Sequence, residues 1–262
     1  MKDGHVHSPY CPHGSKDSFE EYIGKAIVEG IDEISFTEHI ALPNMPIDKK
    51  LLEECALSID STKNYIRDVI LLKEKYKDKI KINLGFEVDF VEGYEEEIRK
   101  ILNEYGKYID DSILSVHFVK YNEEYRCIDM LSDFEYLLKE LGSLESVYDL
   151  YYNTLLASIN ADLGMYKPKR IGHPTLVRKF CLKYPYEYKN KELLNKIVYE
   201  IKNKKYEVDY NTAGLRKEFC GEVYPSGLLL ELIKDNNIKL VYGSDSHTAV
   251  DVGKGKLYYN RS

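Results

Sequence analysis

The sequence predicts an α/β protein built on parallel strands, and two observations support that prediction. Short apolar segments that end in polar residues alternate with amphipathic helical segments along the chain. The chain has 262 residues, which suits one large domain, and α/β barrels of this length commonly form a single domain. We therefore expect one domain over residues 1–262.

Seven segments have the pattern of a strand, and helical segments lie between them. The expected strands are 2–7, 30–39, 80–89, 110–118, 169–174, 206–212 and 238–247. The expected helices are 18–29, 51–76, 94–105, 189–204 and 226–236. The first helix has a capping box in Ser18 and Glu21. Residues 120–166 exceed what one crossover needs and show helical patterns near 133–141 and 144–164, so we expect a helical insertion there.

Composition excludes several classes of protein. The net charge of −7 argues against a dedicated nucleic-acid surface, although an acidic chain can still carry a local basic patch. Five scattered cysteines without CxxC spacing indicate neither a zinc ribbon nor a disulfide framework. No apolar run is long enough to cross a membrane, and the first residues lack an apolar signal core. We expect a cytoplasmic protein, and the sequence does not indicate an oligomeric state.

The histidines lie at the carboxyl ends of the expected strands or in the loop beside them. In a closed parallel α/β barrel these ends meet on one face, which carries the active site. Glu87 and Asp245 also lie at strand ends. Glu38 precedes His39 and would point to the opposite side of the strand, so we expect it to orient a metal ligand and not to bind the metal itself. The complete histidine set is His5, His7, His13, His39, His117, His173 and His247.

This convergence predicts a metal cluster. A single histidine is usually a surface or core residue, but that explanation fails for seven histidines placed in the same way. One zinc ion takes roughly four ligands, so the set implies two or three divalent ions with a bridging carboxylate. Mixed histidine and carboxylate ligands suit zinc, manganese or iron.

Such a cluster suits hydrolysis of a phosphate ester, since several close cations activate water and neutralise phosphate charge. We find no motif for a serine or cysteine nucleophile, and we interpret Cys11, near the histidines, as a packing residue. Phosphate also needs fixed positive donors, which arginine supplies best. Arg178 and Arg216 follow strand ends and are the candidates, with surface salt bridges as the alternative interpretation; Arg126, in the insertion, is a weaker candidate.

The ordered motifs resemble the polymerase and histidinol phosphatase (PHP) superfamily. The segments are DGHVHSPYCPHG, SFTEH, GFEVD, SVHF, IGHP, NTAGLRK and GSDSH, and the match spans nearly the whole chain. Each motif alone is weak, but the ordered set is specific. Within the superfamily, the chain most resembles the monofunctional histidinol-phosphatases.

The resemblance implies a distorted (β/α)7 barrel, similar to a TIM barrel, with a trinuclear metal site at the carboxyl ends of the strands. The implied activity is hydrolysis of L-histidinol phosphate, a small-molecule ester, in histidine biosynthesis. Arg178 and Arg216 match places that contact phosphate in the family. The implied ligand sets are His5, His7, Glu87 and Asp245 for one ion, Glu87, His117 and His173 for the second, and His13, His39 and His247 for the third.

Other parts of the site are less defined by the sequence. Phe118 is a candidate to stack on the imidazole of the substrate, or it packs in the core. Glu123 or Glu124 is a candidate partner of the amine, or both lie on the solvated surface. Asp245 and His247 are the candidates that protonate the leaving group.

Three other functions are alternatives. A PHP-type phosphoesterase or nuclease would act on nucleotides or single-stranded DNA, but the acidic chain has no extended basic tract. A protein-tyrosine phosphatase of this type fits the segment HSPYCPHG less well. A structural zinc protein would close its coordination shell, whereas these ligands lie at a barrel mouth beside arginines.

Overall fold

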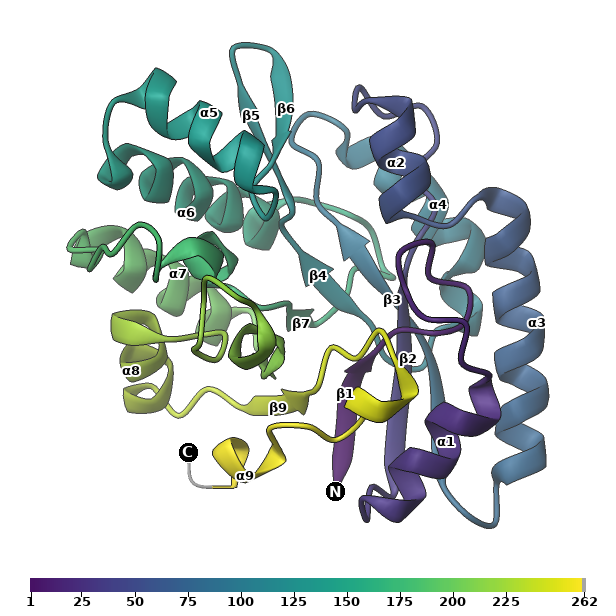
Figure 1. Ribbon diagram of the computed structural model, residues 1–262. Helices are drawn as coiled ribbons and strands as arrows, with labels where there is room; N and C mark the ends of the chain where they lie inside the picture. The colour runs from purple at the N-terminus through teal and green to yellow at the C-terminus, as the bar shows by residue number, and fades with distance from the viewer. Residues whose placement is uncertain (261–262) are drawn as a thin grey trace.

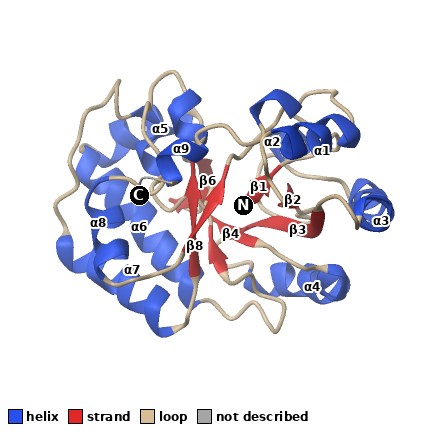
Figure 2. Cartoon of the chain, turned by 90° about the horizontal axis from the view of Figure 1, so that it is seen from below, coloured by secondary structure: helices blue, strands red, loops and turns tan. Residues whose placement is uncertain are grey.

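A seven-stranded parallel sheet forms the centre of the protein (Figures 1 and 2). The computed structural model describes residues 1–260. The sheet is nearly closed into a barrel, and helices surround it. All seven expected strands are confirmed. In spatial order they are β1 (Lys2–Val6), β2 (Glu33–His39), β3 (Lys81–Asp89), β4 (Ile113–Ser115), β7 (Arg170–Ile171), β8 (Glu207–Asn211) and β9 (Leu240–Gly243).

The first and last strands meet at the mouth of the barrel, beyond the end of β9. The amide of His7 donates to the carbonyl of Ser246 at 2.9 Å, and the amide of Asp245 donates to the carbonyl of His5 at 2.7 Å. Val6 and Ser246 form an isolated parallel bridge there. These bonds hold the carboxyl end of β1 against the residues that follow β9.

The helices follow the expected order. Ser18 caps α1 with the predicted capping box, in which the side chain of Glu21 returns to the amide of Ser18. None of the described helices is both long and apolar enough to cross a membrane. The helices outside the insertion are α1 (Phe19–Val28), α2 (Lys49–Cys55), α3 (Ile59–Tyr76), α4 (Glu95–Tyr105), α7 (Lys191–Asn203), α8 (Gly227–Asp235) and α9 (Lys256–Tyr259).

The prediction of one helix over 51–76 is wrong, because α2 and α3 are separate. Ser58 begins α3 as its N-cap, and its side chain accepts from the amide of Ser61 at 3.0 Å. The amide of Leu57 instead donates to the carbonyl of His39 at the end of β2, at 3.2 Å. An internal serine cap therefore interrupts a pattern that looks continuous in hydrophobicity alone.

The segment between β4 and β7 contains a hairpin as well as the two expected helices. β5 (Phe118–Tyr121) and β6 (Glu124–Cys127) pair antiparallel, and Asn122 and Glu123 connect them with φ of 49° and 62°. Two positive φ values are the geometry of a two-residue turn that matches strand twist. The helices are α5 (Leu131–Leu141) and α6 (Leu144–Asn160). The expected strand 110–118 therefore ends earlier, at Ser115.

Candidate metal centre and substrate pocket

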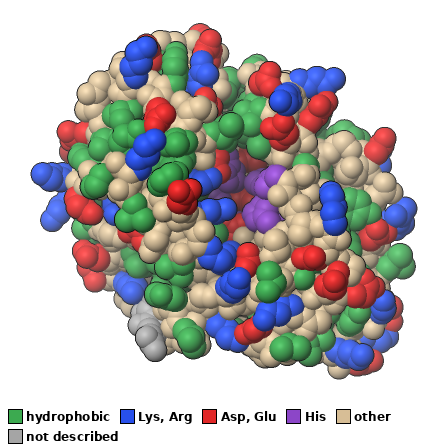
Figure 3. All heavy atoms as spheres, viewed as in Figure 1, with side chains coloured by type: hydrophobic (Ala, Val, Ile, Leu, Met, Phe, Trp, Pro, Cys, Tyr) green, Lys and Arg blue, Asp and Glu red, His purple; other side chains and the backbone are tan. Residues whose placement is uncertain are grey.

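A cavity of about 510 Å³ opens among the carboxyl ends of the strands. In the space-filling view the histidines lie at the base of a hollow, and lysine and arginine side chains lie beside it (Figure 3). Each strand end delivers its residue because parallel strands finish on the same face. The predicted site residues that line the cavity are His7, His13, His39, Glu87, His117, Phe118, His173, Arg216, Asp245 and His247.

Glu87 lies at the centre of the histidine cluster and is buried. Its Oε1 lies 2.8 Å from Nε2 of His173 and 3.7 Å from Nε2 of His117. Its Oε2 faces three further histidines. The distances to their Nε2 atoms are 3.3 Å for His5, 3.5 Å for His7 and 3.5 Å for His39. One carboxylate thus faces five imidazoles, which is the arrangement expected of a bridging ligand.

Asp245, which follows β9 near the carboxyl end of the chain, also lies beside the cluster. Its Oδ1 lies 3.3 Å from Nε2 of His7 and 3.6 Å from Nδ1 of His247. The φ of Asp245 is 51°, in the left-handed region that non-glycine residues seldom adopt. The hydrogen bond that the Asp245 N–H donates to the carbonyl of His5 holds this backbone in place. A strained backbone of this kind is typical of functional sites.

Several nitrogens of the cluster lack a conventional hydrogen-bond partner. Nε2 of His7 is buried and has no hydrogen-bond partner among the described residues. Nε2 of His13 faces Nε2 of His247 at 3.0 Å. Two imidazole nitrogens at that distance share at most one proton between them, so a cation that accepts both lone pairs suits the arrangement better. The donor set therefore fits divalent metal ions.

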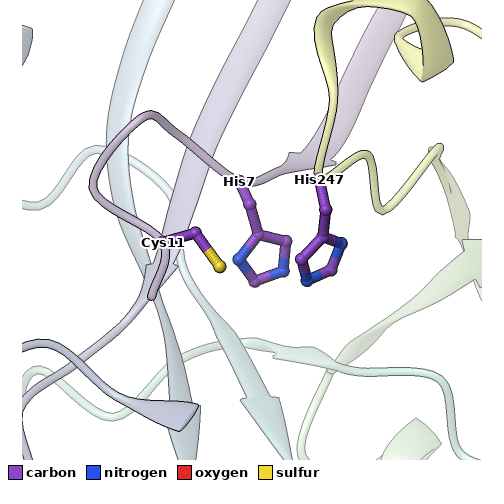
Figure 4. A group of neighbouring side chains, drawn as sticks. All are labelled: His7, Cys11 and His247. Atoms are coloured by element: carbon purple, nitrogen blue, oxygen red, sulfur yellow. The ribbon is translucent and has the colours of Figure 1, made fainter. Parts of the chain in front are cut away.

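Three groups of side chains can each converge on one ion, with ligand atoms within 4.8 Å of one another. A further group joins His39, Asp89 and His117. Another joins His7 and His247 to Cys11, whose sulfur points toward His7 (Figure 4). Two of the three groups match predicted ligand sets: Glu87, His117 and His173; and His13, His39 and His247. The third group is His5, His7 and Glu87, which is the remaining predicted set without Asp245.

Carboxylates behind the cluster orient the imidazoles. Oε1 of Glu38 lies 3.0 Å from Nδ1 of His7, a partner that the sequence did not identify, and Oε2 accepts from the hydroxyl and amide of Ser8. Burial alone would raise the pKa of Glu38, but the contacts with His7 and Ser8 hold it at about 2. Glu38 is therefore ionised at neutral pH and leaves Nε2 of His7 free to face the cluster.

Two further carboxylates of this kind were missed in the sequence. Oδ2 of Asp209 lies 2.8 Å from Nδ1 of His5. Asp89 contacts Nδ1 of His117 and lies 3.3 Å from Nδ1 of His39. Asp89 stands two residues after Glu87 on β3, a spacing that places both on one face and offered a usable signal. Asp209 lies in β8, far from any histidine in sequence, so only the fold reveals its role.

Arg178 does not lie in the cavity, contrary to expectation. It is buried within the short helix Leu176–Phe180, and its Nε donates to Oε1 of Glu222 at 2.8 Å. Its other nitrogens contact the carbonyl of Tyr186 and Oε1 of Glu187. The spacing between His173 and Arg178 in the sequence does not predict which side chains of the helix Leu176–Phe180 point into the cavity. Arg126 pairs with Glu124 and Asp133 and also lies outside the cavity lining.

The basic side chains that line the cavity are those of Lys179, Arg216 and Lys217, and Arg178 is not among them. Nζ of Lys179 lies 2.9 Å from Oδ2 of Asp129, which also lines the cavity. Burial alone would lower the pKa of Lys179, but Asp129 raises it above its ordinary value, so Lys179 is a cation at neutral pH. The guanidinium of Arg216 donates to the carbonyl of Ser244 at 2.7 Å, beside Asp245.

Among the candidates for the rest of the substrate, only Phe118 lines the cavity. It is buried at the start of β5. Glu123 and Glu124 are exposed and pair with Lys120 and Arg126, so neither faces the histidines. Besides Glu87, Asp89 and Asp245, the carboxylates that line the cavity are Glu54, Asp129 and Asp251.

Residues 3–213 match the PHP domain family, and the chain belongs to that family. It is 42% identical over 255 residues to the histidinol-phosphatase of Bacillus subtilis, covering 96% of this chain and 95% of that protein. It is 27% identical over 258 residues to the histidinol-phosphatase of Lactococcus lactis, with 94% and 84% covered.

Two solved structures share the fold. A crystal structure from Listeria monocytogenes, assigned as a histidinol phosphatase, superposes with a TM-score of 0.92 at 36% identity, covering 99% of this chain and 100% of that one. The histidinol phosphate phosphatase of Lactococcus lactis, complexed with zinc, L-histidinol and phosphate, superposes with a TM-score of 0.67 at 21% identity, covering 99% and 92%. The barrel predicted from the sequence is therefore confirmed.

Proposed function

We propose that this protein is a cytoplasmic histidinol-phosphatase, which hydrolyses L-histidinol phosphate to L-histidinol and phosphate in histidine biosynthesis. The observation that carries the proposal is the cavity in which Glu87 faces five imidazoles beside Lys179 and Arg216. The 42% identity to a histidinol-phosphatase along nearly the whole chain supports the same activity.

The residues present fit two or three divalent ions, with zinc first because mixed imidazole and carboxylate ligands suit it. Asp245 completes the first of the three ligand groups, since its Oδ1 lies within 3.8 Å of both His5 and His7. Ions bound there would supply Lewis acidity, which activates water and neutralises charge on phosphate. Manganese and iron remain the other candidates.

The side chains of the cavity have separate tasks in this proposal. Lys179 and Arg216 hold the phosphate, since both are cationic and line the cavity near the cluster. Phe118 offers a ring against which the imidazole of the substrate packs. The expected phosphate contact from Arg178 is replaced by one from Lys179, because Glu222 already binds the Arg178 guanidinium.

The departing alkoxide needs a proton, and Asp245 and His247 are the candidate donors. Both line the cavity, and the His247 side chain is 24% exposed, so it can exchange protons with solvent. Asp245 is also a proposed ligand, so its replacement by asparagine is informative only when metal content is measured as well. Full turnover with full metal content in Asp245→Asn would remove Asp245 from both tasks.

Phosphate release tests the proposed function. Chelator-treated protein is assayed with zinc or manganese on L-histidinol phosphate, p-nitrophenyl phosphate and a deoxynucleotide monophosphate. We expect L-histidinol phosphate to be turned over faster than the others by orders of magnitude, and chelation to abolish turnover. Preference for the deoxynucleotide would instead favour the nucleotide phosphoesterase. If p-nitrophenyl phosphate alone were turned over, the proposed metal centre would stand, but L-histidinol phosphate would be refuted as the substrate.

A further inference from the structure

Two cysteines far apart in sequence lie together outside the metal centre. Cys181 follows the short helix Leu176–Phe180, and Cys220 follows the short helix Ala213–Arg216. The amide of Leu182 donates to the carbonyl of Phe219 at 2.9 Å, so the two segments run side by side. The thiol of Cys181 lies 3.3 Å from the carbonyl oxygen of Cys220.

The surroundings of the pair favour thiol chemistry. The Cys181 thiol donates to Oε1 of Glu222 at 2.9 Å, and Arg178 donates to the same oxygen. Interaction with the Cys181 side chain lowers the pKa of Cys220 to about 7, although burial and the charge of Glu222 act in the opposite direction. A thiol with a pKa near neutrality is partly thiolate, the nucleophilic form.

A second cavity of about 510 Å³ lies beside the pair, in which Cys181 is half-buried and Cys220 is buried. It lies apart from the metal centre, and both cysteines line it together with Arg178 and Glu222. A lone buried cysteine would be inert packing. Two cysteines on adjacent segments, with a carboxylate beside one thiol and a cavity reaching both, form a reactive pair.

We propose that Cys181 and Cys220 form an intramolecular disulfide on exposure to a peroxide, and that this bond restrains the segments that carry Lys179 and Arg216 and lowers turnover. The Cys220 thiolate attacks one peroxide oxygen, which gives a sulfenic acid and releases the other oxygen as water. The Cys181 sulfur then attacks the sulfenic sulfur and the S–O bond breaks. Glu222 accepts the proton of the Cys181 thiol and passes it to the departing hydroxide, which leaves as the second water. Two thiols are oxidised and one peroxide is reduced to two waters.

The disulfide should affect turnover because both cysteines lie close in sequence to cations of the substrate cavity. Cys181 stands two residues after Lys179, and Cys220 stands four residues after Arg216. Both cations line the substrate cavity. A covalent bond between the segments fixes the separation of these two side chains, so the cavity loses the freedom to adjust around a phosphate ester and its products.

The test treats zinc-loaded protein with hydrogen peroxide and then blocks remaining thiols. We expect free thiols to fall by two from the five of the reduced chain. Tryptic digestion should give residues 180–183 cross-linked to residues 218–234, and dithiothreitol should release them. Turnover should fall at least two-fold and return with dithiothreitol.

Variants separate this pair from other oxidation. Cys220→Ser and Cys181→Ser should each abolish the cross-link and keep turnover under peroxide, whereas Cys55→Ser, which changes a half-buried cysteine elsewhere, should retain the cross-link. Absence of the cross-linked peptides while Cys55 is oxidised would overturn the proposal. An equal loss of turnover in Cys220→Ser would do the same. The thiol count and peptide map are independent of the substrate, so they stand apart from the proposed function.

Discussion

Arg178 and Lys179 are neighbours in sequence, but the structure gives them opposite surroundings. The Leu176–Phe180 turn directs Arg178 toward Glu222 and away from the histidines. The same turn directs Lys179 into the substrate cavity, where Asp129 holds it. We therefore expect one cation to affect catalysis and the other to affect stability.

Replacing Lys179 with methionine removes a proposed phosphate contact. Hydrogen bonds to charged groups contribute roughly 1.5–3 kcal/mol, which corresponds to about a 10- to 100-fold loss in kcat/KM for the phosphate ester. Steady-state kinetics on L-histidinol phosphate measure this loss. Lys183→Met, which changes an exposed lysine paired with Glu135, is the matched control and should leave kcat/KM unchanged. Equal kinetics in both variants would refute the role of Lys179.

Replacing Arg178 with methionine should lower stability rather than substrate affinity. It leaves Glu222 without its guanidinium partner in a partly buried place, and we expect a loss of about 1–3 kcal/mol in the free energy of unfolding. Urea denaturation measures it. Glu187→Gln removes only an exposed partner of Arg178 and should change stability by less than about 0.5 kcal/mol. A KM increase in Arg178→Met comparable with that of Lys179→Met would contradict this assignment.

Asp209 supports the metal centre through His5, and it also accepts a hydrogen bond from Asn211, which donates to Asp245. Replacing Asp209 with asparagine removes the charge that holds Nδ1 of His5. Losing such a partner typically costs about 10- to 100-fold in metal affinity, and we expect that loss for zinc. Competition with a chromophoric chelator measures it, and Asp235→Asn at the exposed end of α8 is the control. Unchanged zinc affinity in Asp209→Asn would show that His5 needs no such support.

At the scale of elements, the end of α2 contacts a histidine of the metal centre because α2 and α3 are separate helices. The carbonyl of Glu54, near the end of α2, lies 2.9 Å from Nδ1 of His13. That carbonyl is accessible because α2 ends there, since the last carbonyls of a helix have no intrahelical partner. A continuous helix over 51–76 would have bonded it to an amide within the helix.

Removing the cap that separates these helices should weaken the fold. Ser58→Ala leaves the amide of Ser61 without its acceptor, and such a loss costs about 1 kcal/mol. Thermal or urea unfolding measures the effect. Ser58→Asp keeps an oxygen acceptor at the N-cap and should retain wild-type stability, which makes it the matched control. A fully stable Ser58→Ala would mean that the contact of Leu57 with His39 sets the break instead.

The strands were predictable from sequence because each is a short apolar run ending in a polar residue, and His39, Glu87 and His173 mark three of those ends. The convergence of these ends follows from parallel topology alone. The roles of Lys179 and Asp209 were not predictable, since one depends on the direction of a short helical turn and the other on contact across the barrel. The hairpin β5–β6 was missed because its turn, Asn122 and Glu123, lacks glycine.

For the whole molecule, metal removal should lower thermal stability. Ions that bind the folded chain alone stabilise it by about 4 kcal/mol at a thousand times the dissociation constant. At roughly 2–4 °C per kcal/mol for a chain of this size, chelation should lower Tm by about 10 °C. Calorimetry with and without a chelator measures this, and zinc but not calcium should restore Tm. An unchanged Tm after verified loss of zinc would show that the histidine cluster is stable without ions.

The meeting of β1 with the residues after β9 has a consequence for the timing of assembly. His5 and His7 are synthesised before β2 and every later strand, whereas Asp245 and His247 are synthesised only after β9. The first and third proposed ligand sets are therefore incomplete during most of translation. A nascent chain can gather the second set, Glu87, His117 and His173, much earlier. We therefore expect an ion held by residues from both ends of the chain to bind after an ion held by the second set.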